Sequence, residues 1–452
     1  MPRKPDRTLW AAGLLCLIPV PALAQEGLFH TELENGLDVI VVENSIVPLA
    51  TVEIDVRNGA FTESPEYDGL SHLYEHMFFK ANEEIPDQER FLERTRELGM
   101  VWNGTTSEER VNYFFTLSKE NLAEGLDFMR AAIMTPLFAQ EELVKERPVV
   151  TGEYDRAEAN PFFHLFRAVD EKLWYEHFSR KNVIGDRDII LTATEEKMRT
   201  VQKRYYIPNN SALFVAGDVD HEEVFRLARE KFGAWERGPD PFELYAVPEH
   251  PPLTKDEVVV VEKPVNAVTF RIAMHGPSAS KDEKATYAAD VLSFIVGQRN
   301  SEFQKKLVDS GLTTGVSLSY TTLDHTGPIN IFSQTTPEKF AEATKTVFEQ
   351  IDHFTDPDYF TDEQLENAKT QLAIGELYGQ ERPSTFVHTL GFWWSVTDGL
   401  DYYAHYVENL RKVTREDVAA YVRKYMQNRH HVLGILVSPE DRAKLTIDQP
   451  VS

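Results

Sequence analysis

The sequence repeats itself once, at an offset of about 220 residues. The apolar run Asp38–Glu43 recurs as Glu257–Glu262, 219 residues later. The helical pattern Thr194–Tyr205 recurs as Thr414–Tyr425, 220 residues later, and each copy leads into an apolar strand. Landmarks that share one offset indicate a duplicated structural unit. A chain of 452 residues has room for two such units.

Each copy mixes hairpin-forming strands with several helices. The alternation in Ala50–Val56 predicts a strand, and four apolar residues at helical spacing (Leu122, Leu126, Met129 and Ile133) predict a core-facing helix. We therefore expect an α+β fold of two duplicated domains, each a mostly antiparallel sheet with helices packed on one face. Residues 237–256 are proline-rich and form the predicted linker, which places the domains at residues 25–236 and 257–452.

The first 24 residues have the pattern of a cleavable signal peptide. Basic residues precede the short apolar run Leu9–Val20, and Ala22–Ala24 matches a cleavage site. A membrane anchor is the alternative, but this run is shorter than the ~20 residues that a spanning helix needs. We expect export, to the periplasm if the source is a Gram-negative bacterium, and no membrane span in the mature chain.

Cysteine usage and charge limit the kinds of site that the chain can build. Cys16 is the only cysteine and lies in the predicted signal peptide, so His, Asp or Glu must hold any metal ion. The net charge of −26 disfavours a nucleic-acid partner and favours cationic partners or peptides. An acidic surface that only keeps the protein soluble explains the charge equally well.

The strongest chemical motif is His72-Leu-Tyr-Glu75-His76. On a helix, histidines four residues apart project from one face and can bind one metal ion. Glu75 lies beside them, where a general base for a metal-activated water belongs. This H-x-x-E-H order is the inverzincin motif. The alternative is coincidence on a helix face, so the hypothesis needs a third ligand.

Several acidic residues downstream could supply that ligand. The candidates in the first unit are Glu141, Glu142, Glu146, Glu153, Asp155 and Glu158, and spacing alone does not choose among them. Glu146 and Glu153 are seven residues apart and would share a face of one helix, although Pro148 between them can kink it. A solvent-exposed helix face is the ordinary interpretation of any one of these residues.

The chain resembles the pitrilysin/insulinase-type zinc metallopeptidases, in the compact two-domain form related to mitochondrial processing peptidase. The resemblance rests on Gly69–Phe79, Asn103–Ser107, Glu146–Glu153, Tyr206–Asn210 and the duplication. It implies a Zn²⁺ ion held by His72, His76 and Glu153, which lies 77 residues after the second histidine. It also implies Glu75 as the general base and Glu146 as a supporting catalytic residue.

The same resemblance implies how a peptide binds. The substrate would add as an extended strand to the sheet edge Val101–Thr106, where Asn103, Gly104 and Thr105 are the predicted substrate-binding residues. Active members of the family usually carry an Arg and a Tyr, seven apart, in the second half. Here Leu307 and Thr314 occupy those positions. We therefore expect a heterodimer in which a homologous partner chain supplies that pair.

The leading hypothesis from the sequence is thus the zinc-bearing subunit of a periplasmic endopeptidase. One alternative is a non-catalytic peptide-binding or scaffold subunit of the same fold, which the missing Arg/Tyr pair favours. A purely structural zinc site is another. The unit without the motif has Val291 near the position that corresponds to His72, so we expect no metal there.

Overall fold

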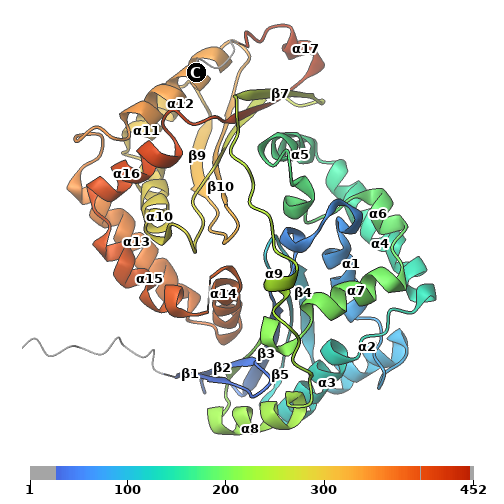
Figure 1. Ribbon diagram of the computed structural model, residues 1–452. Helices are drawn as coiled ribbons and strands as arrows, with labels where there is room; N and C mark the ends of the chain where they lie inside the picture. The colour runs from blue at the N-terminus through green and yellow to red at the C-terminus, as the bar shows by residue number, and fades with distance from the viewer. Residues whose placement is uncertain (1–26, 398, 448–452) are drawn as a thin grey trace, which may run out of the picture.

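The computed structural model describes residues 27–397 and 399–447. Its strands form two sheets, one from each half of the sequence, and helices cover both (Figure 1). The fold is therefore of the α+β class with two similar units, which confirms the class predicted from the sequence. The predicted signal peptide, residues 1–24, lies outside the described residues. No helix in the described ranges has the length and apolar character needed to cross a bilayer.

The first sheet has six strands in the order β1-β2-β6-β3-β5-β4. They are β1 (Leu28–Glu32), β2 (Asp38–Glu43), β3 (Leu49–Val56), β4 (Val101–Thr106), β5 (Val111–Ser118) and β6 (Ser211–Gly217). Neighbouring strands are antiparallel except β2 and β6, which run parallel. Because β4 is the last strand, β5 is its only partner in the described sheet.

Except for α5 (Pro161–Leu173), which packs on the sheet of the second half, the helices of the first half share a core with this sheet. They are α1 (Leu70–Phe78), α2 (Gln88–Glu97), α3 (Leu122–Met134), α4 (Gln140–Glu158), α6 (Arg187–Leu191), α7 (Glu195–Tyr205) and α8 (His221–Phe232). Val52 and Ile54 of β3 share one core with Leu73 of α1 and Leu126 of α3. The predicted helix 122–133 thus buries its apolar stripe as expected.

The second sheet has five strands in the order β7-β11-β8-β10-β9. They are β7 (Glu257–Glu262), β8 (Val268–His275), β9 (Gly315–Tyr320), β10 (Pro328–Thr335) and β11 (Val432–Val437). The remaining helices are α9 (Pro241–Leu244), α10 (Glu283–Gly297), α11 (Glu302–Gln304), α12 (Phe340–His353), α13 (Asp362–Gly379), α14 (Pro383–Val396), α15 (Asp401–Lys412), α16 (Arg415–Tyr425) and α17 (Pro439–Arg442).

Apart from β1, which has no counterpart in the described second sheet, the two sheets repeat the same topology. Asp38 pairs with Ala212 in parallel strands of the first sheet, and Glu257 pairs with Val432 in the corresponding strands of the second. The helix α7 and its counterpart α16 each begin with a threonine N-cap that accepts a backbone N–H. The duplicated pattern in the sequence thus corresponds to a repeated supersecondary unit.

One helix of each half packs on the sheet of the other half. Helix α14 lies on β3 and β6 of the first sheet, and α5 lies on β7, β8 and β11 of the second (Figure 1). The prediction of helices on one face therefore holds when each half is taken with its own helices only. The second face of each sheet is covered by the exchanged helix.

Between the halves, the predicted linker 237–256 contains α9 and no other described helix or strand. The domain limits 25–236 and 257–452 stay a prediction.

Candidate metal centre

Helix α1 carries the H-x-x-E-H motif, and its start is fixed by backbone contacts. Gly69 precedes the helix with a left-handed φ of 91°, and a Cβ there would lie 2.6 Å from the Cα of Gly185. The buried carboxylate of Glu63 accepts the backbone N–H groups of Gly69 and Ser71, both at 2.6 Å. These bonds use N–H groups that have no partner inside the helix. These contacts therefore fix the position of the first turn of α1, which contains His72.

The structure brings His72, His76 and Glu153 together. The Nε2 atoms of the two histidines lie 3.6 Å and 3.7 Å from Oε2 of Glu153. Donor atoms of a tetrahedral zinc site lie about 3.3–3.5 Å apart, because each is about 2.0–2.1 Å from the ion. Among the described residues, this is the one group of three or more His, Cys, Asp or Glu whose donor atoms all lie within 4.8 Å of one another. The donor set fits zinc.

Electrostatics favour the metal-binding form of the first ligand. Burial, and then the neighbouring His76, lower the pKa of His72 to about 4. His72 is therefore neutral at pH 7, with a lone pair available for a metal ion. The ring planes of the two histidines are nearly perpendicular, with their centroids 4.9 Å apart.

Glu146 contacts a histidine of this group. The Nδ1–H of His76 donates to Oε1 of Glu146 at 2.9 Å, which leaves Nε2 of His76 facing Glu153. The other oxygen of Glu146 forms an ion pair with Lys80. Burial acts to raise the pKa of Glu146, but the bonds to His76 and Lys80 outweigh it and lower that pKa. Helix α4 continues through Pro148, so Glu146 and Glu153 both reach α1.

Glu75 lies in the same cavity as the two histidines. Its Oε2 accepts the hydroxyl of Thr106 at 2.7 Å. Burial raises the pKa of Glu75, and the bond from Thr106 lowers it in part. A carboxylate whose pKa is raised above its ordinary value is better suited to accept and return a proton. The cavity measures about 390 Å³ and is lined by His72, Glu75, His76, Phe79, Lys80, Gln88, Trp102, Asn103, Gly104, Glu146 and Glu153.

Two of the three predicted substrate-binding residues reach this cavity. Asn103 and Gly104 line it, whereas the hydroxyl of Thr105 donates to Asn112 on β5. A Cβ on Gly104 would lie 3.0 Å from Cγ of Glu75 and 3.0 Å from the ring of Phe79. The missing side chain therefore lets β4 lie close against α1.

Several residues in or beside the cavity were not predicted from the sequence. Lys80 lies four residues after His76, and this helical spacing indicates that the two side chains lie on the same side. Thr106 and Trp102 come from β4, and the sequence does not show that they face α1. Trp102 stacks on Phe79 with ring centroids 4.5 Å apart, which gives the cavity an aromatic wall.

Among the residues of the second half that the structure describes, no comparable set of ligands comes together. Val291, Leu292 and Ile295 of α10 are buried in its core. Leu307 is fully buried, and Thr314 is an exposed residue that donates to a backbone carbonyl of β10. The second half thus offers neither a metal site on α10 nor an Arg/Tyr pair at these positions.

Two family models match the chain. The model described as Insulinase (Peptidase family M16) matches residues 39–186, and the one described as Peptidase M16 inactive domain matches residues 192–372. An uncharacterized zinc protease of Rickettsia felis is 25% identical over 360 residues, which cover 79% of this chain and 85% of that protein. A probable mitochondrial-processing peptidase subunit beta of Arabidopsis thaliana is 24% identical, covering 64% of this chain and 54% of that protein.

The fold is also similar to solved structures. A protease from Helicobacter pylori superposes with a TM-score of 0.80 at 21% sequence identity, over 90% of this chain and 99% of that one. At this identity the likeness concerns the fold alone. It agrees with the two-unit architecture.

Proposed function

Since the chain belongs to the insulinase family of M16 peptidases, we propose that it is the zinc-bearing subunit of an endopeptidase. The observation that carries this proposal is the convergence of His72, His76 and Glu153 in a cavity that also holds Glu75. A structural zinc site has a closed shell of four protein ligands, whereas a catalytic site has three and an open position. Relatives described as zinc proteases support the choice of metal.

Each residue then has a separate task. His72, His76 and Glu153 would hold the ion, and Glu146 orients His76 through Nδ1. A bound zinc ion supplies a Lewis acid and brings the pKa of water to about 7. Glu75 takes up the proton of the attacking water and delivers one to the leaving amine. The hydroxyl of Thr106 donates to Oε2 of Glu75 and so fixes the orientation of this carboxylate.

The peptide would bind along β4. This strand is a sheet edge, and its outer N–H and C=O groups can pair with an extended peptide. Asn103 and Gly104 would then lie against the peptide backbone beside Glu75, and Thr105 would act through Asn112. Main-chain pairing demands little of the peptide sequence, so selectivity would depend on the side-chain pockets.

A homologous partner chain would complete the active site. Leu307 is buried and Thr314 bonds to the backbone, so neither reaches a substrate carbonyl as an Arg or Tyr does. We place the pair on a partner subunit, as a heterodimer, and the assembly in the periplasm after removal of residues 1–24. The second candidate function is a non-catalytic peptide-binding subunit, which the same missing pair favours.

One set of assays separates these functions. The zinc-loaded chain, alone and with each homologue encoded beside it, is tested on quenched-fluorescence peptides. We expect cleavage only with the partner, and Glu75→Gln should abolish it while zinc content stays at one ion per chain. Zinc-dependent cleavage by the chain alone would contradict the partner requirement. Peptide binding without cleavage in any combination would favour the non-catalytic subunit.

A further inference from the structure

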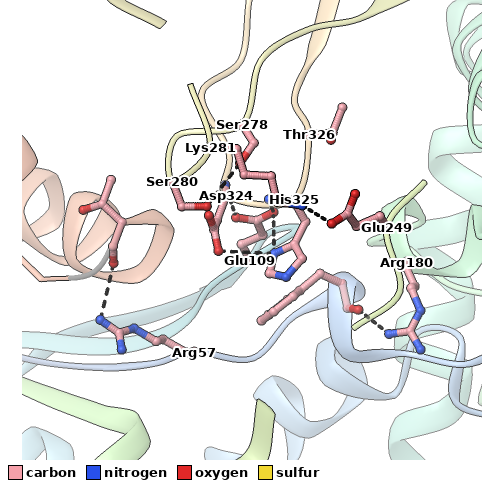
Figure 2. Close-up of polar contacts among 12 residues, drawn as sticks. Arg57, Glu109, Arg180, Glu249, Ser278, Ser280, Lys281, Asp324, His325 and Thr326 are labelled. Carbon is pink, nitrogen blue, oxygen red and sulfur yellow. Dashed lines mark hydrogen bonds and ion pairs between the residues drawn. The ribbon is translucent and has the colours of Figure 1, made fainter. Parts of the chain in front are cut away.

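The turn that follows β4 is held by the second half of the chain. This turn, residues 107–110, joins β4 to β5 and contains Glu109, which is only 1% exposed. Oε2 of Glu109 accepts the backbone N–H of Asp324 at 2.7 Å, and Oε1 accepts that of His325 at 2.8 Å. Figure 2 shows Glu109 directly beside these two residues, which belong to the β9–β10 turn. A hairpin tip of one half is therefore bonded to a hairpin tip of the other.

A partly buried lysine bonds to carbonyl groups of the same β9–β10 turn. The ammonium of Lys181 donates to the carbonyls of His325 and Thr326, both at 2.9 Å. Burial acts to raise the pKa of Glu109, but the bond to His325 and the charge of Lys181 outweigh it and lower that pKa. The carboxylate thus stays charged, and charge-assisted bonds to backbone N–H groups are stronger than neutral ones.

The next residue of the β4–β5 turn contacts a different element of the second half. Nη1 of Arg110 donates to the backbone carbonyl of His388 in α14 at 2.9 Å. The same guanidinium lies 3.7 Å from Asp55 and 3.9 Å from Glu53, which are buried under α14. Two adjacent residues therefore join the turn to two separate elements of the second half.

These anchors lie close in the chain to the residues that face the metal centre. Thr106, whose hydroxyl holds Glu75, directly precedes the turn. The strand itself is an edge with β5 as its one partner strand in the described sheet. An edge strand paired on one side is less ordered than a central strand unless something else fixes its end. The anchored turn supplies that constraint.

We propose that the second half of the chain orders β4 for peptide binding. Glu109 and Arg110, in the turn after β4, are the positioning residues through which it acts. This inference rests on the proposed function in so far as β4 is the strand that pairs with the peptide. A strand that is ordered before binding loses less conformational entropy when the peptide pairs with it, which increases affinity. The second half thus contributes to substrate binding without supplying a metal ligand.

The test compares two variants of the zinc-loaded full chain by hydrogen exchange. Glu109→Gln removes the charge and one of the two acceptors at the turn. Arg271→Gln is the matched control, because buried Arg271 also joins the halves, through a 2.8 Å bond to Asp170 of α5, but lies on β8. We expect exchange of the β4 amides to accelerate about tenfold in Glu109→Gln, as loss of one charged hydrogen bond predicts. In Arg271→Gln the β4 amides should keep wild-type rates relative to the rest of the first sheet.

A kinetic measurement separates positioning from stability. With the active assembly and one quenched-fluorescence peptide, Glu109→Gln should raise KM more than it lowers kcat, at unchanged zinc content. If both variants give the same β4 exchange, the turn has only a structural role and the proposal is overturned. If the assembly cleaves no peptide at all, the proposed function fails, while the exchange experiment still decides whether the second half orders β4.

Discussion

Replacing Gly69 by alanine tests whether the start of α1 sets the metal centre. Gly69 has a φ of 91°, and an alanine Cβ would lie 2.6 Å from the Cα of Gly185 and 3.1 Å from the side chain of Ile190. A left-handed alanine costs about 1–2 kcal/mol, and overpacking costs about 1–3 kcal/mol. The two effects together predict that Gly69→Ala lowers the free energy of unfolding by about 2–5 kcal/mol.

Gly99→Ala is the matched control. Gly99 follows α2 with a φ of 65°, and a Cβ there would meet no atom within 4 Å, so only the backbone cost applies. Urea unfolding gives the two stabilities, and competition with a chelator gives the zinc affinities. We expect Gly69→Ala to be the less stable variant and to bind zinc about tenfold more weakly, as for other changes behind a metal ligand. Equal stabilities, or wild-type zinc affinity in Gly69→Ala, would refute this reasoning about the helix start.

Three further predictions concern the cavity and its surroundings. Glu146→Gln should weaken zinc binding by about 10–100-fold in chelator competition, because His76 loses its charged partner. Gly104→Val should abolish cleavage and leave zinc content unchanged, since its side chain would push β4 away from Glu75. Burial lowers the pKa of His275 to about 4, so the folded chain binds fewer protons than the unfolded chain between pH 4 and 6.5. Stability present above pH 6.5 should therefore fall by about 3 kcal/mol toward pH 4, and urea unfolding of His275→Gln should show a flatter slope across this window.

The sequence predicted the parts of the site that depend on local periodicity. A spacing of four residues on a helix puts His72 and His76 on one face in any fold, and the structure has them side by side. The offset of the repeat similarly predicted two related sheets. Spacing left six acidic candidates for the third ligand. The proximity of Glu153 to both histidines depends on how α4 packs against α1.

The sequence pattern does not predict which elements, far apart in the chain, contact one another. The alternation in β3 correctly predicts a strand, but it does not show that Glu53 and Asp55 are fully buried under a helix of the other half. An apolar stripe shows that a helix packs on something and not on which sheet it packs. For the same reason, Thr106 and Lys80 were not predicted as neighbours of Glu75 and Glu146.

Because α14 packs on the first sheet, the second half of the chain supports the site although its α10 carries no metal ligands. Ile40 and Phe214 of the first sheet share one apolar cluster with Phe270, Val387 and Leu390 of the second half. The first sheet therefore depends on α14 to cover one of its faces, and the turn after β4 depends on α14 and the β9–β10 turn for its anchors. The second half, whose α10 carries no metal ligands, still encloses the buried carboxylates of β3 and holds the edge strand. There is thus a physical reason for both halves to stay together, because separating them would expose the outer face of the sheet that carries the site.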